Sequence, residues 1–299
     1  MVTVFFRGGL GNQMFQYALG LNLAKKNNTE LFLDTVHVSD RFPRTNFTHR
    51  TFDLPDVFEV APRFTALSRV ASAVPIPGVW LGLDLLGMNI KERLGGRKIL
   101  YEDERKGFDA GVLDARGNLI LYGRFENEKY FSDVADEVRA AFHFRHTLDG
   151  VAAEVAREIA RVNSISLHVR RGDFVGSKKV EKIMGKTGAP YYERAADHVA
   201  AYVKDPHFFI FSDDIAWCKE NIKLRYPATY VESNSAGPKG AHHLQLMSLC
   251  KSHIIANSTF SWWGAWLDPN PRKIVIAPKQ WLADEKFVRE VVPENWVKF

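Results

Sequence analysis

The densest group of chemically capable side chains is the stretch HVRRGD at 168–173, which directly follows a short apolar run. Two adjacent arginines, Arg170 and Arg171, suit a diphosphate because each guanidinium presents a rigid fork of donors that stays charged. His168 and Asp173 flank them, and Gly172 permits a sharp turn. The simpler interpretation is a surface ion pair between Asp173 and an arginine. Taken alone, the motif favours an anion site only slightly.

Two further polar groups follow apolar runs in the same half of the chain. Ser212-Asp213-Asp214 follows the run 207–211, and Asn257-Ser258-Thr259 opens a helical pattern that continues through Phe260 and Ser261. Hydroxyl groups beside the unpaired N–H groups of a helix start can hold an anion. Each group also has a structural interpretation, since Asp213 or residues 257–259 could serve as helix N-caps and His168 could be a hydrogen-bonded core residue.

The pair Asp213-Asp214 also raises a metal interpretation. Carboxylates after a strand are expected ligands of hard ions such as Mg²⁺ or Mn²⁺, which could neutralise a diphosphate. The arginines and the hydroxyl-rich helix start could neutralise the same charge without a metal. His242-His243 has no third ligand at metal spacing and indicates an exposed helix. We expect no metal and no cofactor.

The elements that must position these residues alternate regularly in the second half. Strands are predicted at 165–169, 207–211, 229–231, 253–256 and 273–277, separated by helices near 190–203, 215–224, 241–250 and 259–267, with another at 151–162 before them. This alternation predicts a parallel, doubly wound sheet, in which ligands bind outside the carboxyl ends of the strands. All three polar groups lie at such ends.

The first half begins with a strand at 2–6, a glycine-rich turn, a helix at 14–25 and a strand at 30–34. The turn suggests a dinucleotide fingerprint, with Asp34 at a plausible distance, but Met14 occupies the position where a small residue is required. The features that remain are close backbone approach, N–H groups, and the amides of Asn12 and Gln13 beside Gly11.

Residues 40–115 are predicted as a variable, loop-rich insertion, with a short buried helix at 79–88. A strand at 119–123 and a helix at 134–142 complete this half. We divide the chain into two domains, 1–148 and 149–299.

Composition is typical of a globular protein, with 299 residues, 46% hydrophobic, 25% charged and a net charge of +5. Two cysteines give no disulfide framework, and no apolar window approaches the ~18 residues of a membrane span. We expect a cytoplasmic protein; association with the inner face of the membrane remains open.

With these residues assembled, the chain resembles the bacterial α1,2-fucosyltransferases, a family related to eukaryotic α1,2-, α1,6- and protein-O-fucosyltransferases. The matching motifs are GGLGNQMFQYA at 8–18, EKYF at 128–131, HVRRGDF at 168–174, Tyr191-Tyr192, FSDD at 211–214 with Trp217, IIANSTFSWWGAWL at 254–267 and APKQW at 277–281. The resemblance implies an α/β protein of two Rossmann-like domains in the glycosyltransferase B-type arrangement. In this arrangement 1–148 would be the acceptor-side domain and 149–299 the nucleotide-sugar domain. It also implies inverting, metal-independent transfer of L-fucose from GDP-β-L-fucose to the galactose 2-hydroxyl of an oligosaccharide, in carbohydrate biosynthesis.

The resemblance assigns roles residue by residue. It implies that Arg170 holds the β-phosphate, with Arg171 helping or forming an internal ion pair, and that His168 and Asp213 read guanine. The phosphates would contact residues at the start of the last helix, namely Ser258, Thr259, Phe260 and Ser261. Asn12 would lie near the reacting sugar, in an acceptor or hinge loop with Gly11 and Gln13. Asp173 is the candidate general base and Glu181 the second choice.

Two alternatives remain open. A nucleotide-dependent oxidoreductase would use the N-terminal glycine turn. A single-stranded RNA-binding protein would need arginines and the tryptophans Trp262, Trp263 and Trp266 interleaved on one surface, whereas helix–sheet packing is the more frequent role of such tryptophans.

Overall fold

The computed structural model describes residues 1–42, 50–93, 96–171, 187–284, 286–288 and 290–299. The chain forms two compact units, Met1–Arg145 and His146–Phe299, whereas the sequence prediction divided it after residue 148. Asp173 and Glu181, the candidate bases, lie outside the described residues.

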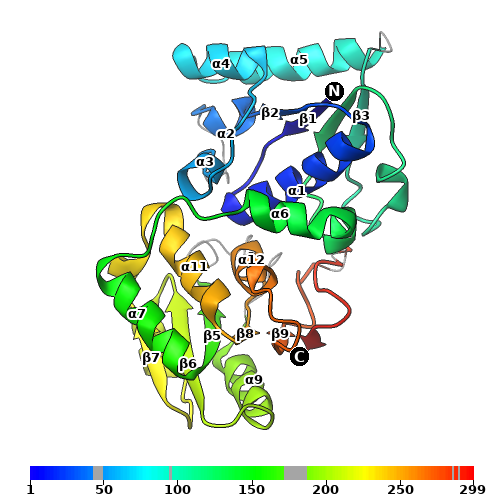
Figure 1. Cartoon of the computed structure of the whole chain (residues 1–299). Coiled ribbons are helices and arrows are strands. Elements are labelled where there is room, and N and C mark those ends of the chain that lie inside the picture. The colour runs from blue at the N-terminus through cyan, green and yellow to red at the C-terminus, as the bar shows by residue number, and fades with distance from the viewer. Residues whose placement is uncertain (43–49, 94–95, 172–186, 285, 289) are drawn as a thin grey trace. The chain divides into compact units, whose positions relative to one another are not determined.

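The first unit contains a four-stranded parallel sheet in the order β2-β1-β4-β3 (Figure 1). Its strands are β1 (Val2–Phe5), β2 (Leu31–Asp34), β3 (Lys98–Tyr101) and β4 (Leu119–Tyr122). Its helices are α1 (Leu10–Lys26), α2 (Val36–Ser39), α3 (Leu54–Val57), α4 (Ala66–Ala73), α5 (Val79–Arg93) and α6 (Ala135–Ala141), with 3-10 turns at Ala110–Val112, Glu128–Tyr130 and Ser132–Val134.

Helix α1 begins earlier than predicted. Gly9, with φ −83° and ψ −176°, occupies the N-cap, so the helix starts at Leu10. Gly11, Asn12 and Gln13 therefore lie in its first turn, and their placement in a loop was wrong. The glycine-rich turn is shorter than its composition suggested because helical hydrogen bonding starts with Gln13 N–H to Gly9 C=O.

The insertion is more ordered than predicted. It supplies β3, which pairs with β4, and helices α4 and α5, which lie on the side of the sheet away from α1 and α6 (Figure 1). Leu81, Leu85 and Met88 of α5 pack on sheet residues that include Phe5 and Ile120. The prediction of a buried helix at 79–88 was wrong: the opposite side of α5 is exposed.

The second unit contains a six-stranded parallel sheet in the order β10-β9-β8-β5-β6-β7. The strands are β5 (Asn163–Val169), β6 (Pro206–Ser212), β7 (Ala228–Val231), β8 (Ser252–Ile254), β9 (Val275–Ala277) and β10 (Val297–Lys298). The helices are α7 (Gly150–Arg161), α9 (Ala189–Ala200), α10 (Ile215–Asn221), α11 (Ala241–Leu249) and α12 (Thr259–Leu267), with 3-10 turns at Ser233–Ser235 and Pro238–Gly240. The alternation predicted every strand but β10.

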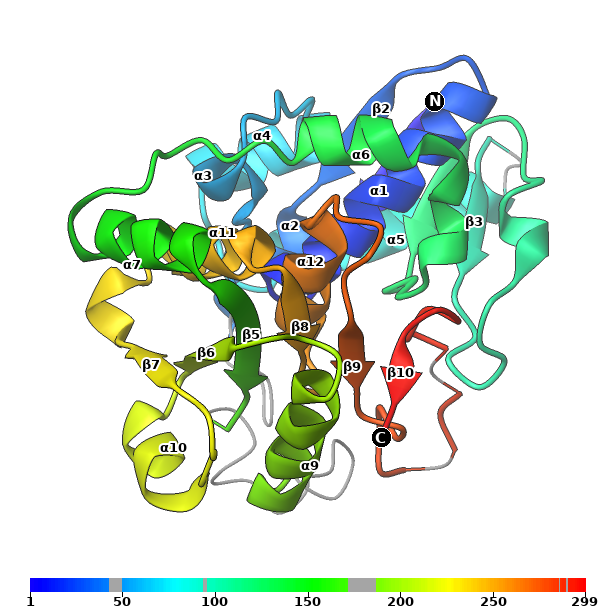
Figure 2. The same ribbon diagram turned by 60° about the horizontal axis from the view of Figure 1, so that its bottom comes forward.

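Helices cover both faces of this sheet (Figure 2). Alternate residues of β5, Ile165, Leu167 and Val169, share a buried apolar cluster with side chains of α9 and α10. The intervening residues of β5 face the side covered by α7, α11 and α12, because successive strand residues point to opposite faces. The predicted doubly wound sheet is confirmed.

No helix within the described ranges has both the length and the apolar character that crossing a bilayer requires.

A glycine pair tests the packing of the first unit. A Cβ on Gly20 of α1 would stand 2.5 Å from Val4 Cγ2 and 2.9 Å from Leu31 Cδ1, whereas one on Gly82 of α5 would meet no atom within 4 Å. We expect Gly20→Ala to lower the free energy of unfolding by roughly 1–3 kcal/mol through overpacking. Gly82→Ala should raise it by up to about 1 kcal/mol because alanine has the better helix propensity. Urea denaturation measures both; equal effects would contradict this account of α1 packing.

Candidate active site

The parallel register of β5 and β6 brings two predicted site residues together. Val169 is paired with Ser212, so Arg170 and Asp213 leave neighbouring strand ends side by side. Arg170 Nη1 lies 3.0 Å from Asp213 Oδ2, and the backbone N–H of Arg171 donates to Asp213 Oδ1 at 2.9 Å. Both side chains of the ion pair keep about a quarter of their surface exposed, 27% and 26%. Asp213 thus orients a guanidinium that remains accessible to a ligand.

Arg171 has a different environment. Its Nε lies 3.2 Å from Asp214 Oδ2, and its guanidinium stacks 3.9 Å from the centre of the Trp217 ring. Asp214 also accepts the N–H of Trp217 at 3.1 Å as the N-cap of α10. The capping role considered for Asp213 therefore belongs to Asp214, and Arg171 forms an internal ion pair.

His168 is buried on the side of β5 that faces α11 and α12. Burial, then the charge of Arg170 and the proximity of His243, lower the pKa of His168 from 6.5 to about 3. The neutral ring can donate one hydrogen bond and accept another. Its Nδ1 is buried without a hydrogen-bond partner among the described residues, and its ring centre lies 6.0 Å from that of Phe260.

The start of α12 carries the four remaining predicted contacts. Ser258 is the N-cap residue, but its hydroxyl makes no capping hydrogen bond. Ser261 is buried and its hydroxyl donates to the Ser258 carbonyl at 3.2 Å, while Thr259 and Phe260 are partly exposed. The N–H groups that open a helix, beside a hydroxyl that makes no capping bond, favour an anion.

The tryptophans of α12 and the histidine pair of α11 are buried, so neither group forms a surface that could bind a ligand. Trp262, Trp263 and Trp266 are buried against one another, as the packing interpretation predicted, so they offer no stacking platform for RNA bases. His242 and His243 are also buried, so the prediction of an exposed pair was wrong. The ring of His243 fits beside Phe211, and its Nε2 lies 3.1 Å from the Ser235 hydroxyl.

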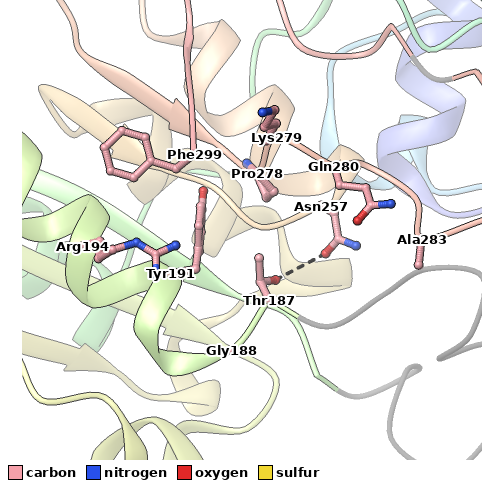
Figure 3. A pocket seen from close by; sticks show the side chains of 10 residues that line it. All are labelled: Thr187, Gly188, Tyr191, Arg194, Asn257, Pro278, Lys279, Gln280, Ala283 and Phe299. Atoms are coloured by element: carbon pink, nitrogen blue, oxygen red, sulfur yellow. Dashed lines mark hydrogen bonds between the residues drawn. The ribbon is translucent and has the colours of Figure 1, made fainter. Parts of the chain in front are cut away.

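A cavity of about 680 Å³ opens beside Asn257, along the same carboxyl edge of the sheet (Figure 3). The start of α9 and the end of β9 line it, and it contains two cationic side chains, Arg194 and Lys279. Tyr191 fixes one wall, because its hydroxyl donates to the Ile255 carbonyl at 2.7 Å. No role was predicted for these residues, although Tyr191 and Lys279 belong to motifs that carry the family resemblance.

Sequence reasoning also missed a buried polar chain. The Ser166 hydroxyl lies 2.9 Å from His253 Nδ1, and His253 Nε2 lies 3.0 Å from Asp268 Oδ2. The three residue types are those of a serine hydrolase triad, but the two ring nitrogens have exchanged partners and all three residues are buried. Substrate cannot reach the hydroxyl, so the chain links β5, β8 and the end of α12 structurally.

The glycine-rich turn of the first unit is held by amides. Gln13 Nε2 donates to the carbonyls of Gly8 and Thr51, and its Oε1 accepts the N–H of Asp53. Gln13 is fully buried, so these bonds give it a structural role. Asn12 is half-buried, and its Nδ2 would lie 2.5 Å from a Cβ on Gly8.

Asp34 does not match the acidic residue of a dinucleotide site. It is buried, and it accepts hydrogen bonds from the N–H of Val36 and the hydroxyls of Ser68 and Thr65. A ribose would have to replace these bonds, which argues against the oxidoreductase alternative.

The structure adds no third metal ligand to Asp213 and Asp214 among the described residues. Within the described ranges, no three His, Cys, Asp or Glu side chains are grouped to hold a metal ion. Metal independence stays a prediction.

These features define an α/β protein with a parallel, doubly wound sheet and a cationic, hydroxyl-rich site at its carboxyl edge, which is where such folds bind nucleotides. The model of glycosyl transferase family 11 matches residues 106–299. An α-1,2-colitosyltransferase of Escherichia coli is 31% identical, covering 100% of this chain and 98% of its own. The chain therefore belongs to glycosyl transferase family 11 and is a glycosyltransferase, as the resemblance predicted.

Other relatives of the chain are also glycosyltransferases. The O-antigen biosynthesis glycosyltransferase WbnK of Escherichia coli is 29% identical over 97% of both chains. The human galactoside α-(1,2)-fucosyltransferase 1 is 25% identical over 98% of this chain and 72% of its own. A crystal structure of the fucosyltransferase NodZ from Bradyrhizobium aligns with a TM-score of 0.50 at 14% identity, covering 88% of this chain and 91% of its own. The predicted α/β fold class is confirmed.

Substitutions of Asp213 and Asp214, the two aspartates at the end of β6, should have different effects on stability and on ligand binding. Asp214→Ala removes a helix cap and the partner of Arg171, so we expect it to lower the free energy of unfolding by about 1–2 kcal/mol. Asp213→Asn keeps the side-chain shape at a partly exposed position and should cost less stability. GDP affinity, measured by calorimetry, should fall more in Asp213→Asn than in Asp214→Ala. The reverse order for stability or for GDP affinity would contradict the assignment.

Proposed function

We propose that this enzyme transfers L-fucose from GDP-β-L-fucose to the 2-hydroxyl of a galactose residue in a glycan, with inversion to an α1,2-fucoside. The observation that carries the proposal is the placement of the Arg170 guanidinium, oriented by Asp213 and still accessible, at the carboxyl edge of the sheet. The names of the relatives support the α1,2 linkage, and the human relative supports fucose and a galactoside. The reaction is proposed for the cytoplasm; two buried free thiols, Cys218 and Cys250, agree with a reducing compartment.

In the proposed reaction the acceptor oxygen bonds to C1 of fucose as the bond from C1 to the diphosphate oxygen breaks. The hydroxyl proton passes to a base, for which Asp173 remains the candidate and Glu181 the second choice. Charge accumulates on the leaving diphosphate, so Arg170, the Ser258 hydroxyl, and the N–H and hydroxyl groups of Thr259 would stabilise the transition state. Stabilisation by these groups would make a metal unnecessary.

The base of the nucleotide would be read beside the same residues. Guanine presents N–H donors at N1 and N2, which suit a carboxylate oxygen of Asp213. His168 is buried, neutral and has a ring nitrogen without a partner among the described residues, so it suits a second polar contact. Phe260 would pack beside the phosphates, Ser261 would lie near them, and Asn12 would lie near the reacting sugar.

A colitosyl donor is the second candidate. The relative with 31% identity over the whole chain is named for colitose, a sugar that lacks the 3-hydroxyl of L-fucose. Both donors would present the same guanine and diphosphate to the residues named above, so these residues do not choose between them.

The decisive assay offers GDP-fucose, GDP-colitose, GDP-mannose and UDP-galactose with a galactose-terminated oligosaccharide, in excess EDTA and with Mn²⁺. We expect GDP-fucose to give the highest kcat/KM, an α1,2 linkage in the product, and equal rates with EDTA and Mn²⁺. A preference for GDP-colitose would establish the second candidate. Rates abolished by EDTA and restored by Mn²⁺ would overturn the metal-free mechanism and, with it, the role given to Arg170.

Arg170 should be the most sensitive position of the site. Arg170→Ala removes a charge-assisted contact made in the transition state, so kcat/KM should fall roughly 100-fold or more. Arg170→Lys should also lose most activity, because an ammonium cannot reproduce the fork. The matched control is Arg272→Ala, at an exposed arginine after α12. Near-normal turnover in a folded Arg170→Ala protein, with folding checked by thermal unfolding, would refute the assignment.

A further inference from the structure

The first unit exposes an apolar surface on α4, α5 and the turn between them. Eight of the thirteen large hydrophobic side chains that are exposed among the described residues lie between positions 42 and 90. They are Phe42, Val70, Val74, Ile76, Val79, Leu83, Leu86 and Ile90, with exposed fractions of 45–57%. This concentration exceeds the scattered exposure that is normal for globular proteins.

The exposed residues of α5 form one continuous stripe. Val79, Leu83, Leu86 and Ile90 follow the spacing of a single helix face. The opposite face packs on the sheet through Leu81, Leu85 and Met88. The helix is thus apolar on two sides, and only one of them has a partner in the described structure.

Figure 1 places α4 and α5 end to end along the outer side of the sheet. Val70 of α4 is exposed at 45%, and Val74 and Ile76 continue the surface toward α5 at 52% and 46%. A Cβ on Gly82 or Gly87 would meet no atom within 4 Å, so the surface is also open at these two positions. An extended ridge of this kind suits a flat partner better than a narrow ligand.

The distribution of charge around the ridge favours an anionic partner. From Val70 to Ile90 the sequence contains one charged residue, Asp84, and it is buried. Basic residues lie at both ends of this segment, with Arg69 before it and Arg97 and Lys98 after it. Arg63, further toward the N-terminus, is paired with Glu30. An uncharged apolar stripe flanked by cations complements an anionic bilayer, whose acyl boundary takes the apolar side chains while its headgroups attract the basic ones.

The residue types also favour lipid over another protein. Interface cores between proteins are enriched in tyrosine, tryptophan, methionine and arginine. The stripe on α5 consists of valine, leucine and isoleucine, and Trp80 is only partly exposed, with its Nε1 bonded to the Val74 carbonyl.

We propose that the α4–α5 ridge docks this glycosyltransferase on the surface of a membrane that contains anionic phospholipid. The four aliphatic side chains of α5 enter the boundary between headgroups and acyl chains, and the flanking cations bind the headgroups. The chain is then attached to the surface and does not span the bilayer. The proposal does not depend on which sugar the enzyme transfers.

Cosedimentation with vesicles tests the proposal, using phosphatidylcholine alone and phosphatidylcholine mixed with phosphatidylglycerol. We expect the protein to bind the mixed vesicles more strongly, and added salt to weaken that binding. The double variant Leu83→Glu with Leu86→Glu should bind at least tenfold more weakly, because it places two carboxylates at the boundary. The control is Leu249→Glu, whose leucine is exposed to the same degree, 48% against 49% for Leu83, but lies in α11 of the other unit.

A second variant separates charge from apolar contact. Arg69→Glu with Lys98→Glu leaves the stripe intact at two exposed positions. It should lose roughly fivefold in vesicle binding for each cation removed and lose its preference for phosphatidylglycerol. Far-ultraviolet circular dichroism and thermal unfolding check that each variant is folded.

Four outcomes would overturn the proposal: no binding of the unmodified protein to either vesicle, unchanged binding in the folded Leu83/Leu86 variant, an equal loss in Leu249→Glu, or a charge variant that keeps its preference for phosphatidylglycerol. If sedimentation without lipid instead shows a dimer that the Leu83/Leu86 variant dissociates, and vesicles do not bind, the ridge is an interface between two copies and the lipid proposal falls.

Discussion

The site depends on the register of one pair of strands. Because Val169 lies opposite Ser212 in the parallel sheet, the next residue of each strand emerges at the same edge, and Arg170 meets Asp213. The carboxylate also accepts the N–H of Arg171, so it fixes the backbone turn after β5 as well as the guanidinium. A shift of one residue would turn Asp213 to the other face of the sheet. Placement of the cation therefore follows from the apolar pairing of β5 with β6.

This arrangement neutralises most of the positive charge at the strand ends. Arg170 pairs with Asp213 and Arg171 with Asp214, so the two cations at the strand ends are each matched by a carboxylate. Their contribution to binding an anion comes from oriented donors more than from net potential. Further positive character lies beside them, in the N–H groups that open α12 and in Arg194 and Lys279 of the neighbouring cavity. A sugar diphosphate extending along this edge would meet oriented donors first and a cationic wall next to them.

The sequence predicted what depends on periodicity and chain order, and it missed what depends on packing in three dimensions. The strands β5 to β9 and the polar groups at their ends follow from alternation. Asp213 and Asp214 are equivalent in sequence, and only the register shows that one orients Arg170 while the other caps α10. The burial of His242 and His243 also depends on packing: His243 lies against Phe211, a neighbour that no local pattern identifies. The structural role of Gln13, predicted to lie in an acceptor or hinge loop, depends on a bond to Thr51, and that of Asp34 depends on a bond to Ser68; neither partner is a neighbour in sequence.

Helix α5 shows the limit of pattern reasoning most clearly. A segment that is apolar around its whole circumference predicts burial on all sides, yet here the sheet covers only one side. The helix propensity of its residues forms α5, and its sheet-facing side chains pack it against the sheet. Folding therefore does not require leucine at the exposed positions Leu83 and Leu86. Charge at those positions would be tolerated, as on most exposed helix faces, and its absence from the exposed positions between Val70 and Ile90 therefore reflects something other than stability. The residues that would bind the membrane surface lie in Met1–Arg145, and those that would bind the nucleotide lie in His146–Phe299. Attachment and nucleotide binding thus depend on separate cores.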